Sequence, residues 1–148
     1  MGFHDLLSNP LLVSPLLAWT LAQVVKTLIF SVENGRFEWS RLFGDGGMPS
    51  GHSATVTALA TSSALKFGLG SEVFAISAIL AVIVMHDAMS VRLESGKQAR
   101  LLNEVVELLK SKSVLLDAKK LKELLGHTPL QVFFGALLGL VVSLMVGV

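Results

Sequence analysis

Long apolar stretches are the feature of this sequence that most restricts its fold. Residues 11–32, 72–85 and 129–148 are almost continuous runs of hydrophobic side chains, and the first is long enough to cross a hydrocarbon layer of about 30 Å as a helix. Charged residues make up only 16% of the chain, against about 25% in soluble domains. The sequence therefore predicts an all-α integral membrane protein, a helical bundle that forms one membrane-embedded domain over residues 1–148.

A fourth helix is expected over residues 53–67. It is short for a span and rich in alanine, serine and threonine, a composition that favours close helix packing over contact with lipid. We therefore place it at the centre of a bundle of about four spans. In residues 101–109, leucines and valines recur at helical spacing beside charged residues, which predicts an amphipathic surface helix between the third and fourth spans, followed by a shorter helix over residues 117–125.

Charge and composition exclude several classes of function. A net charge of +1 argues against a nucleic-acid partner, and the absence of cysteine excludes disulfides and thiolate metal sites. No metal site is expected, because His86, Asp87 and Asp45 lack a ligand spacing. Most of the lysines and arginines belong to one end of the bundle, so the positive-inside rule puts that end in the cytoplasm of a multi-pass cell-membrane protein, with both termini outside.

Residues 46–54 read Gly-Gly-Met-Pro-Ser-Gly-His-Ser-Ala and lead directly into the central helix. Free backbone N–H groups at the start of a helix, together with the helix dipole, form a favourable site for a phosphate. His52 adds a side chain that can donate or accept a proton near neutral pH. The simpler interpretation is that Ser50 is an ordinary N-cap and His52 a polar residue at the membrane surface. A second histidine in a similar place, His127 just before the last apolar helix, favours the phosphate site.

The topology tests this hypothesis. Four spans bring the end of the first, the start of the second, the end of the third and the start of the fourth to one side of the membrane. The residues found at those points are Lys26, Arg36, Ser50, Gly51, His52, Asp87, Arg92 and His127. Ionisable groups at that depth usually face the bundle interior. The sequence therefore predicts a pocket at the membrane interface with two histidines and several cations.

Two motifs carry a resemblance to a known superfamily. Residues 49–52, Pro-Ser-Gly-His, followed by residues 127–132, His-Thr-Pro-Leu-Gln-Val, resemble the type-2 phosphatidic acid phosphatase and vanadium haloperoxidase superfamily. Residues 46–54, 87–99 and 121–135 look more closely like its small, divergent bacterial and plant branch.

The resemblance implies a metal-independent phosphohydrolase that needs no cofactor and acts on a lipid phosphate or diphosphate. It implies that His127 is the nucleophile, forming a phosphohistidine, and that His52 protonates the leaving oxygen. By the same resemblance, Ser50 and the Gly51 amide bind phosphoryl oxygens. Arg92 and Lys26 are the candidate cations.

The sequence departs from the superfamily pattern at three points. Gln131 replaces an aspartate, and an amide can orient an imidazole but cannot stabilise its charged form as a carboxylate does; Asp87 is a candidate replacement. Arg92 is separated from His127 by a long insertion. Glu33 stands where the first motif has arginine, so Arg36 or Arg41 would have to substitute.

Two other functions remain open at this stage. The chain could be a non-catalytic membrane protein that uses the phosphate cradle to bind a lipid headgroup or a partner. A haloperoxidase is a more distant alternative. Gly135 and Gly139 form a small-xxx-small face that leaves room for a homo-oligomer.

Overall fold

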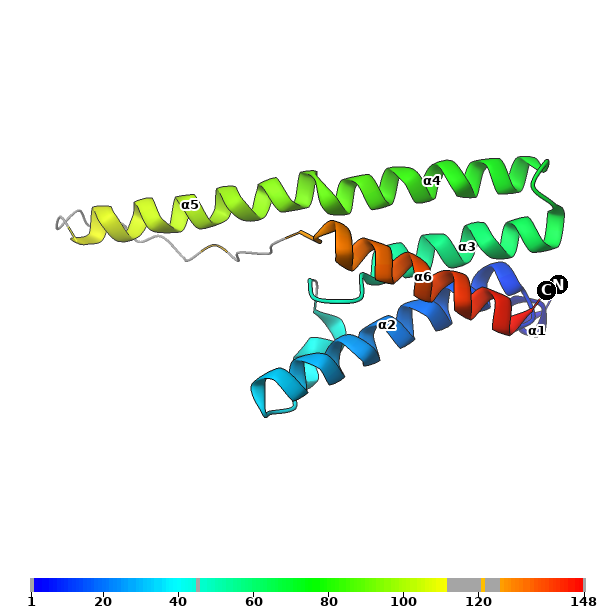
Figure 1. Cartoon of the computed structure of the whole chain (residues 1–148), viewed down its shortest axis with the longest axis horizontal. Helices are drawn as coiled ribbons and strands as arrows, with labels where there is room; N and C mark the ends of the chain where they lie inside the picture. The colour runs from blue at the N-terminus through cyan, green and yellow to red at the C-terminus, as the bar shows by residue number, and fades with distance from the viewer. Residues whose placement is uncertain (1, 45, 112–120, 122–125, 148) are drawn as a thin grey trace.

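The computed structural model describes residues 2–44, 46–111, 121 and 126–147, and within these ranges every regular element is a helix (Figure 1). The elements are α1 (Phe3–Leu7), α2 (Pro10–Asn34), the 3₁₀ helix η1 (Trp39–Phe43), α3 (Gly51–Phe67), α4 (Glu72–Met89), α5 (Val91–Ser111) and α6 (Pro129–Val146). The predicted all-α helical bundle is confirmed.

Capping residues fix where the apolar helices begin. The side chain of Asn9 accepts a hydrogen bond from the N–H of Leu11 at 3.1 Å and caps α2, and Ser71 caps α4 by accepting from the N–H of Phe74 at 3.2 Å. Gly35 ends α2 in the left-handed conformation, with φ 64°. The helices therefore lie within a few residues of the ranges predicted from hydropathy.

Helix α3 is the centre of the bundle, as predicted, because it packs against α2, α4 and α6 (Figure 1). The core at these contacts consists of small side chains: Ala18, Ala22, Ala54, Ala58 and Val142, with Leu138 packed against it. Small residues allow the helix backbones to approach closely. Close packing then stabilises the bundle in lipid, where the hydrophobic effect does not drive helices together.

Two glycines of α6 face α3 directly. A β-carbon at Gly135 would overlap the carbonyl oxygen of Ser50, and one at Gly139 would overlap the carbonyl oxygen of Ala54. The small-xxx-small face is therefore used inside the chain, between α6 and α3. It is not left exposed for a contact between two copies of the chain.

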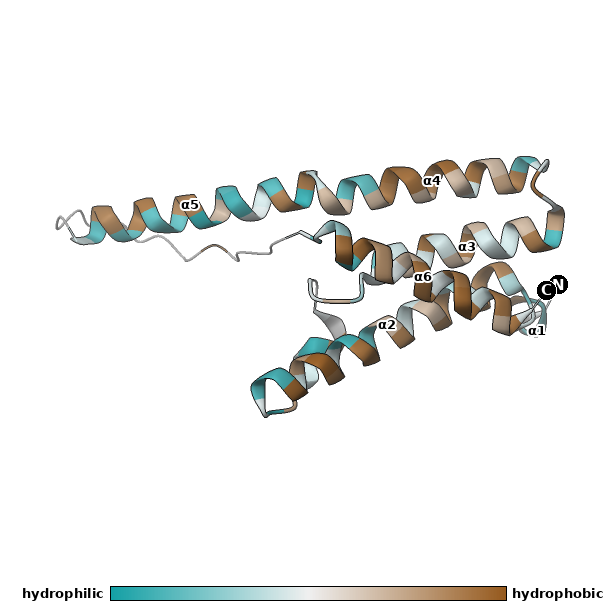
Figure 2. Ribbon diagram, in the orientation of Figure 1, coloured by the Kyte–Doolittle hydropathy of each residue, from teal (hydrophilic) through white to brown (hydrophobic). Residues whose placement is uncertain are grey.

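Helices α4 and α5 follow one another almost in line, and α5 projects beyond the end of the bundle (Figure 1). Together they cover 40 residues, about 60 Å of helix, which is twice the thickness of a hydrocarbon layer. The second half is amphipathic, as predicted, with hydrophilic and hydrophobic side chains alternating along it (Figure 2). Helix α5 continues the direction of α4, and its position relative to a membrane surface stays a prediction.

In the described part of the chain, three helical stretches are long and apolar enough to cross a membrane, by length and composition: α2, the combined α4–α5 and α6. Helix α3 has 17 residues and is just too short to be included. A short helix is compatible with its central position, where other helices surround it. The helix expected over residues 117–125 falls outside the described residues, apart from Leu121. The backbone of Leu121 exchanges two hydrogen bonds of 2.9 Å with the side-chain amide of Asn103 on α5.

Candidate functional site

The candidate site is built where the start of α3, the end of α4 and the segment before α6 meet, on the side of the bundle away from the two termini (Figure 1). Two backbone hydrogen bonds hold these ends together. The N–H of Ser50, just before α3, donates to the carbonyl oxygen of Gln131 in the first turn of α6 at 3.0 Å. The N–H of His127 donates to the carbonyl oxygen of Ala88, near the end of α4, at 2.9 Å. The positions of both motifs are therefore set by main-chain contacts between helices.

Ser50 is completely buried and is the N-cap of α3. Its Oγ accepts hydrogen bonds from the N–H of Ser53 at 3.3 Å and from the Ser53 hydroxyl at 3.0 Å. Gly51 follows as the first residue of the helix, a position whose N–H has no acceptor within the helix. Its α-carbon faces the indole ring of Trp19, at 3.4 Å from the position of a β-carbon. The structure thus gives Ser50 a structural role, while binding of phosphoryl oxygens by Ser50 and Gly51 stays a prediction.

His127 is 3% exposed, and its Nδ1 lies 3.2 Å from Oε1 of Gln131. The same Oε1 accepts a hydrogen bond from the N–H of Thr128 at 3.1 Å, within a capping box at the start of α6. Because a backbone N–H can only donate, this bond identifies the Gln131 atom as the oxygen. An oxygen can only accept from the imidazole, so Nδ1 of neutral His127 carries the proton and Nε2 carries the lone pair.

The ring of His52 lies beside that of His127. The two ring centroids are 5.9 Å apart and the ring planes are inclined by 61°, an edge contact. His52 is half-buried in the first turn of α3, whereas His127 precedes α6. Two imidazoles at this separation can both reach one phosphoryl group, since each hydrogen bond or attacking contact spans about 3 Å.

A polar pocket of ≈ 310 Å³ adjoins the histidines through Gln131. Among the described residues, two cations, Lys26 and Arg41, and one carboxylate, Glu33, contribute to its lining, together with Ile29, Phe30, Gly44, Gly46, Gly47 and Met48. Lys26 is only 7% exposed, and its Nζ donates to the carbonyl oxygen of Gly44 at 3.4 Å. A buried lysine is an expensive arrangement for a membrane helix, and such residues usually face the interior of the bundle.

Glycine is required where the loop passes over Lys26. Gly46 and Gly47 have φ values of 85° and 82°, in the left-handed region that other residues rarely adopt. A β-carbon on Gly47 would also lie 3.1 Å from Cγ of Lys26. The glycine pair thus lets the backbone lie closely over the aliphatic part of the Lys26 side chain, whose ammonium group donates to the Gly44 carbonyl oxygen.

Three of the predicted site residues form ion pairs with neighbouring side chains and do not line the polar pocket. Arg92 and Asp87 form an ion pair with each other, at 3.2 Å, and both side chains are nearly half exposed. Arg36 is 70% exposed and pairs with Glu38 at 2.8 Å. None of the three is among the residues that line the polar pocket. Their predicted roles toward phosphate are therefore not supported by a contact with His127 or the pocket in the described part of the chain.

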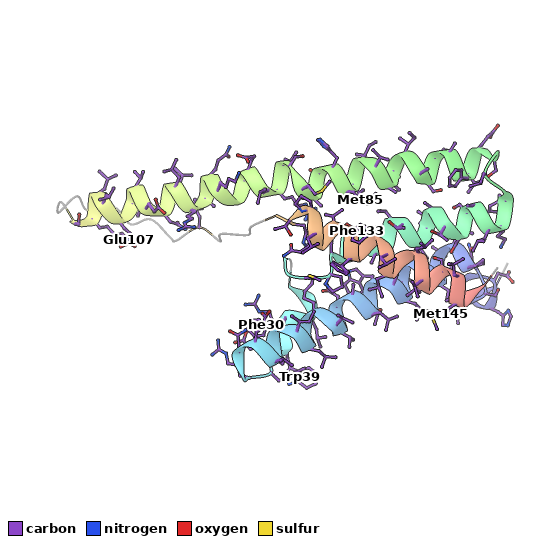
Figure 3. The ribbon with its side chains drawn as sticks, viewed as in Figure 1. Phe30, Trp39, Met85, Glu107, Phe133 and Met145 are labelled. Carbon is purple, nitrogen blue, oxygen red and sulfur yellow. The ribbon has the colours of Figure 1, made fainter. Side chains whose placement is uncertain are left out.

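Arg41 is the pocket cation that the sequence suggested only as a substitute. Its guanidinium lies 4.1 Å from the ring centroid of Phe30, which holds it against α2. Figure 3 shows Phe30 and Trp39 together at the end of α2 and in η1, where the aromatic residues of this connection gather. This contact could not be predicted from the separation of Arg41 and Phe30 in the sequence. It forms because η1 folds back along α2.

Comparisons with known proteins identify the family of this chain. A sequence model described as the divergent PAP2 family matches residues 7–142. The chain is also 45% identical over 150 residues to a Bacillus subtilis (strain 168) protein named "Uncharacterized membrane protein YuiD", with 95% of each chain covered. No solved structure matches the chain. With most of its length matched by the family model and by this relative, the chain belongs to the divergent PAP2 family.

Proposed function

We propose that this protein hydrolyses a lipid phosphate or diphosphate at the membrane interface through a phosphohistidine intermediate. The observation that carries the proposal is the hydrogen-bonded chain from Thr128 through Gln131 to His127, which leaves the lone pair of neutral His127 on Nε2. A nucleophile in the correct tautomer, with an acid beside it and cations nearby, is the arrangement that nucleophilic phosphoryl transfer needs.

In the first step, Nε2 of His127 attacks phosphorus and a P–N bond forms while the bond from phosphorus to the lipid oxygen breaks. His52, in its protonated form, gives its proton to that oxygen, and the lipid alcohol leaves. Gln131 keeps its hydrogen bond to Nδ1–H of the phosphorylated ring. As a neutral amide it stabilises the positive imidazolium less than a carboxylate would, so this step is expected to be slower than in relatives with aspartate.

In the second step, water attacks phosphorus, the P–N bond breaks and inorganic phosphate leaves. Neutral His52 accepts the proton of the attacking water, which restores both histidines to their starting forms. Lys26 supplies positive charge to the phosphoryl oxygens from its buried position beside the pocket. We propose further that this end of the bundle faces the cytoplasm, since most of the basic residues belong to it.

Phosphate release by the purified protein in detergent tests the proposal, with a panel of lipid phosphates and diphosphates and with vanadate as inhibitor. The expected result is vanadate-sensitive release that disappears in His127→Ala. A matched control is His4→Ala, which removes an exposed histidine at the other end of the bundle. Binding of vanadate without release of phosphate from any substrate would instead support a non-catalytic lipid-headgroup protein.

A further inference from the structure

Gln23 is a buried amide on α2 whose side-chain oxygen, Oε1, accepts no hydrogen bond from the described residues. The residue is only 7% exposed, so this oxygen is also shielded from bulk water. A buried carbonyl oxygen without a donor is unfavourable, because it has lost its hydrogen bonds to water. Such an atom in a native protein needs an explanation, and a ligand or a bound water molecule is a common one.

Gln23 differs from the other buried side-chain oxygens without a partner in the described part of the chain, which are the hydroxyls of Ser14, Thr57 and Ser63. A hydroxyl can rotate and donate to a carbonyl oxygen of the preceding turn, as Thr27 and Ser31 do on α2 at 2.8 and 2.7 Å. An amide oxygen can only accept. Of these four groups, Gln23 is therefore the one that needs a donor from outside its own helix.

Two contacts place the Gln23 side chain beside the loop of the first motif. The indole ring of Trp19 lies 3.4 Å from the position that a β-carbon on Gly51 would take. The side chain of Lys26 lies 3.1 Å from the corresponding position on Gly47. Gln23 follows Trp19 by four residues and precedes Lys26 by three, so these side chains project from one face of α2. Gln23 therefore faces the loop between Gly47 and Gly51, at the start of α3.

The second step of the proposed reaction needs an acceptor of this kind. Water brings two hydrogens when it attacks phosphorus, and His52, in the first turn of α3, accepts one of them as a proton. The other hydrogen stays on the oxygen and becomes part of the product phosphate. An acceptor for it would fix the orientation of the water, which is what positions a lone pair toward phosphorus.

Two other side-chain acceptors at the start of α3 and α6 are already occupied. Oγ of Ser50 accepts hydrogen bonds from the N–H and the hydroxyl of Ser53. Oε1 of Gln131 accepts from the N–H of Thr128 and lies within hydrogen-bonding distance of His127 Nδ1. The amide oxygen of Gln23, in contrast, is open to a new donor.

We propose that Oε1 of Gln23 accepts the second hydrogen of the attacking water and so orients this water toward the phosphohistidine. The proposal rests on the proposed function and adds a residue that neither sequence motif contains. In this step the bond from the water oxygen to phosphorus forms, and the bond from phosphorus to Nε2 of His127 breaks and returns its electron pair to Nε2. One proton passes to His52, and hydrogen phosphate leaves with the hydrogen that Gln23 held.

Methanol tests this role, because it attacks as water does but has a single O–H hydrogen, which goes to His52. With para-nitrophenyl phosphate as substrate, the native protein in detergent is expected to form methyl phosphate beside inorganic phosphate when methanol is added. Gln23→Met removes the acceptor and keeps the length of the side chain. It is expected to slow attack by water but not by methanol, so the ratio of methyl phosphate to inorganic phosphate should rise about tenfold.

Thr27→Val is the matched control. Thr27 is 1% exposed on the same helix, and its hydroxyl donates to the backbone carbonyl oxygen of Gln23 within α2. The product ratio of this variant should equal that of the native protein. Because only active molecules form products, the ratio does not depend on how much of each variant folds. An unchanged ratio in Gln23→Met, or an equal rise in both variants, would overturn the proposal.

The two steps can also be separated by kinetics. The ratio kcat/KM reports the formation of the phosphohistidine, so in Gln23→Met it should stay within about twofold of the native value. The phosphohistidine trapped by alkali during turnover should increase. A fall of kcat/KM by about tenfold would place the effect of Gln23 in the first step and overturn its assignment to the water.

Failure of the proposed function has a different signature. The native protein would then release no phosphate and form no phosphohistidine, and the water site would be rejected with it. Failure of the water site alone leaves both products of the native protein intact. It appears only in Gln23→Met, as a product ratio that matches the native one.

Discussion

Gly135 lies against Ser50 so closely that a β-carbon on the glycine would overlap the serine carbonyl oxygen. This contact joins the first turns of α6 and the start of α3, the two segments that carry His127 and His52. It also explains why position 135, shortly after the second motif, is a glycine. The packing of α6 on α3 therefore holds the two histidines in position, in addition to the loops that precede these helices.

Substitution of Gly135 by alanine should destabilise the protein. The added methyl group must push α6 away from Ser50, and overpacking of this kind costs about 1–3 kcal/mol. Thermal unfolding in detergent would measure the loss. Gly70→Ala is the matched control, since a β-carbon on Gly70 meets nothing within 4 Å, and its effect should stay within about 0.5 kcal/mol. Similar unfolding temperatures for the two variants would contradict the packing described for α3 and α6.

Replacement of Gln131 by alanine should lower kcat by about tenfold to a hundredfold, because the Nδ1–H of His127 loses its acceptor and the reactive tautomer is no longer favoured. Gln131→Glu should keep or raise kcat, because a carboxylate also stabilises the phosphoimidazolium. Steady-state kinetics measures both.

Thr128→Ala separates this role from helix capping. It removes the hydroxyl that caps α6 but not the contact between Gln131 and His127, so it should reduce stability by about 1 kcal/mol and change kcat little. If Gln131→Ala and Thr128→Ala changed kcat and stability to the same extent, an orienting role for Gln131 would be excluded.

His52→Gln should affect substrates according to their leaving group. A lipid alkoxide needs a proton as it leaves, so the variant should hydrolyse lipid phosphates at least about a hundredfold more slowly. A para-nitrophenolate leaves without a proton, so para-nitrophenyl phosphate should be affected much less. The ratio of the two rates measures the general-acid role, and an equal loss for both substrates would exclude it.

The orientation can be tested cleanly because the chain has no cysteine. Ser111→Cys is exposed at the end of α5, on the side of the histidines, and Gly70→Cys is exposed in the α3–α4 connection on the other side. If the site faces the cytoplasm, an impermeant maleimide should label Gly70→Cys in intact cells and Ser111→Cys only after permeabilisation. The opposite pattern would place the site outside.

Hydropathy and motif spacing were enough to predict the bundle and the meeting of His52 with His127. Capping residues mark the ends of the apolar helices. Because successive spans run antiparallel, their order along the chain determines which ends lie on the same side of the membrane. The small residues of α3 likewise predicted its central position, because such a helix gains most from close packing.

The course of α5 and the choice of pocket cation were harder to predict. No glycine or proline occurs between Ser71 and Ser95, so nothing in the sequence breaks the helix between α4 and α5. The change of polarity in this stretch predicted an amphipathic helix, but polarity alone does not determine the direction of a helix. Arg41 rather than Arg36 lines the pocket because η1 folds back on α2, a path that depends on tertiary contacts and leaves no periodic pattern.

The contact between the His127 N–H and the Ala88 carbonyl oxygen has a consequence for how the segment before α6 is attached. Gly126, beside it, lies against the backbone of Arg92 and Leu93, where any side chain would collide. His127 is thus anchored to the end of α4, and Leu121 is anchored separately to Asn103 on α5. Two separate anchors on the same helical rod, one on each side of the polar segment, therefore fix the position of His127 from α4 and that of Leu121 from α5.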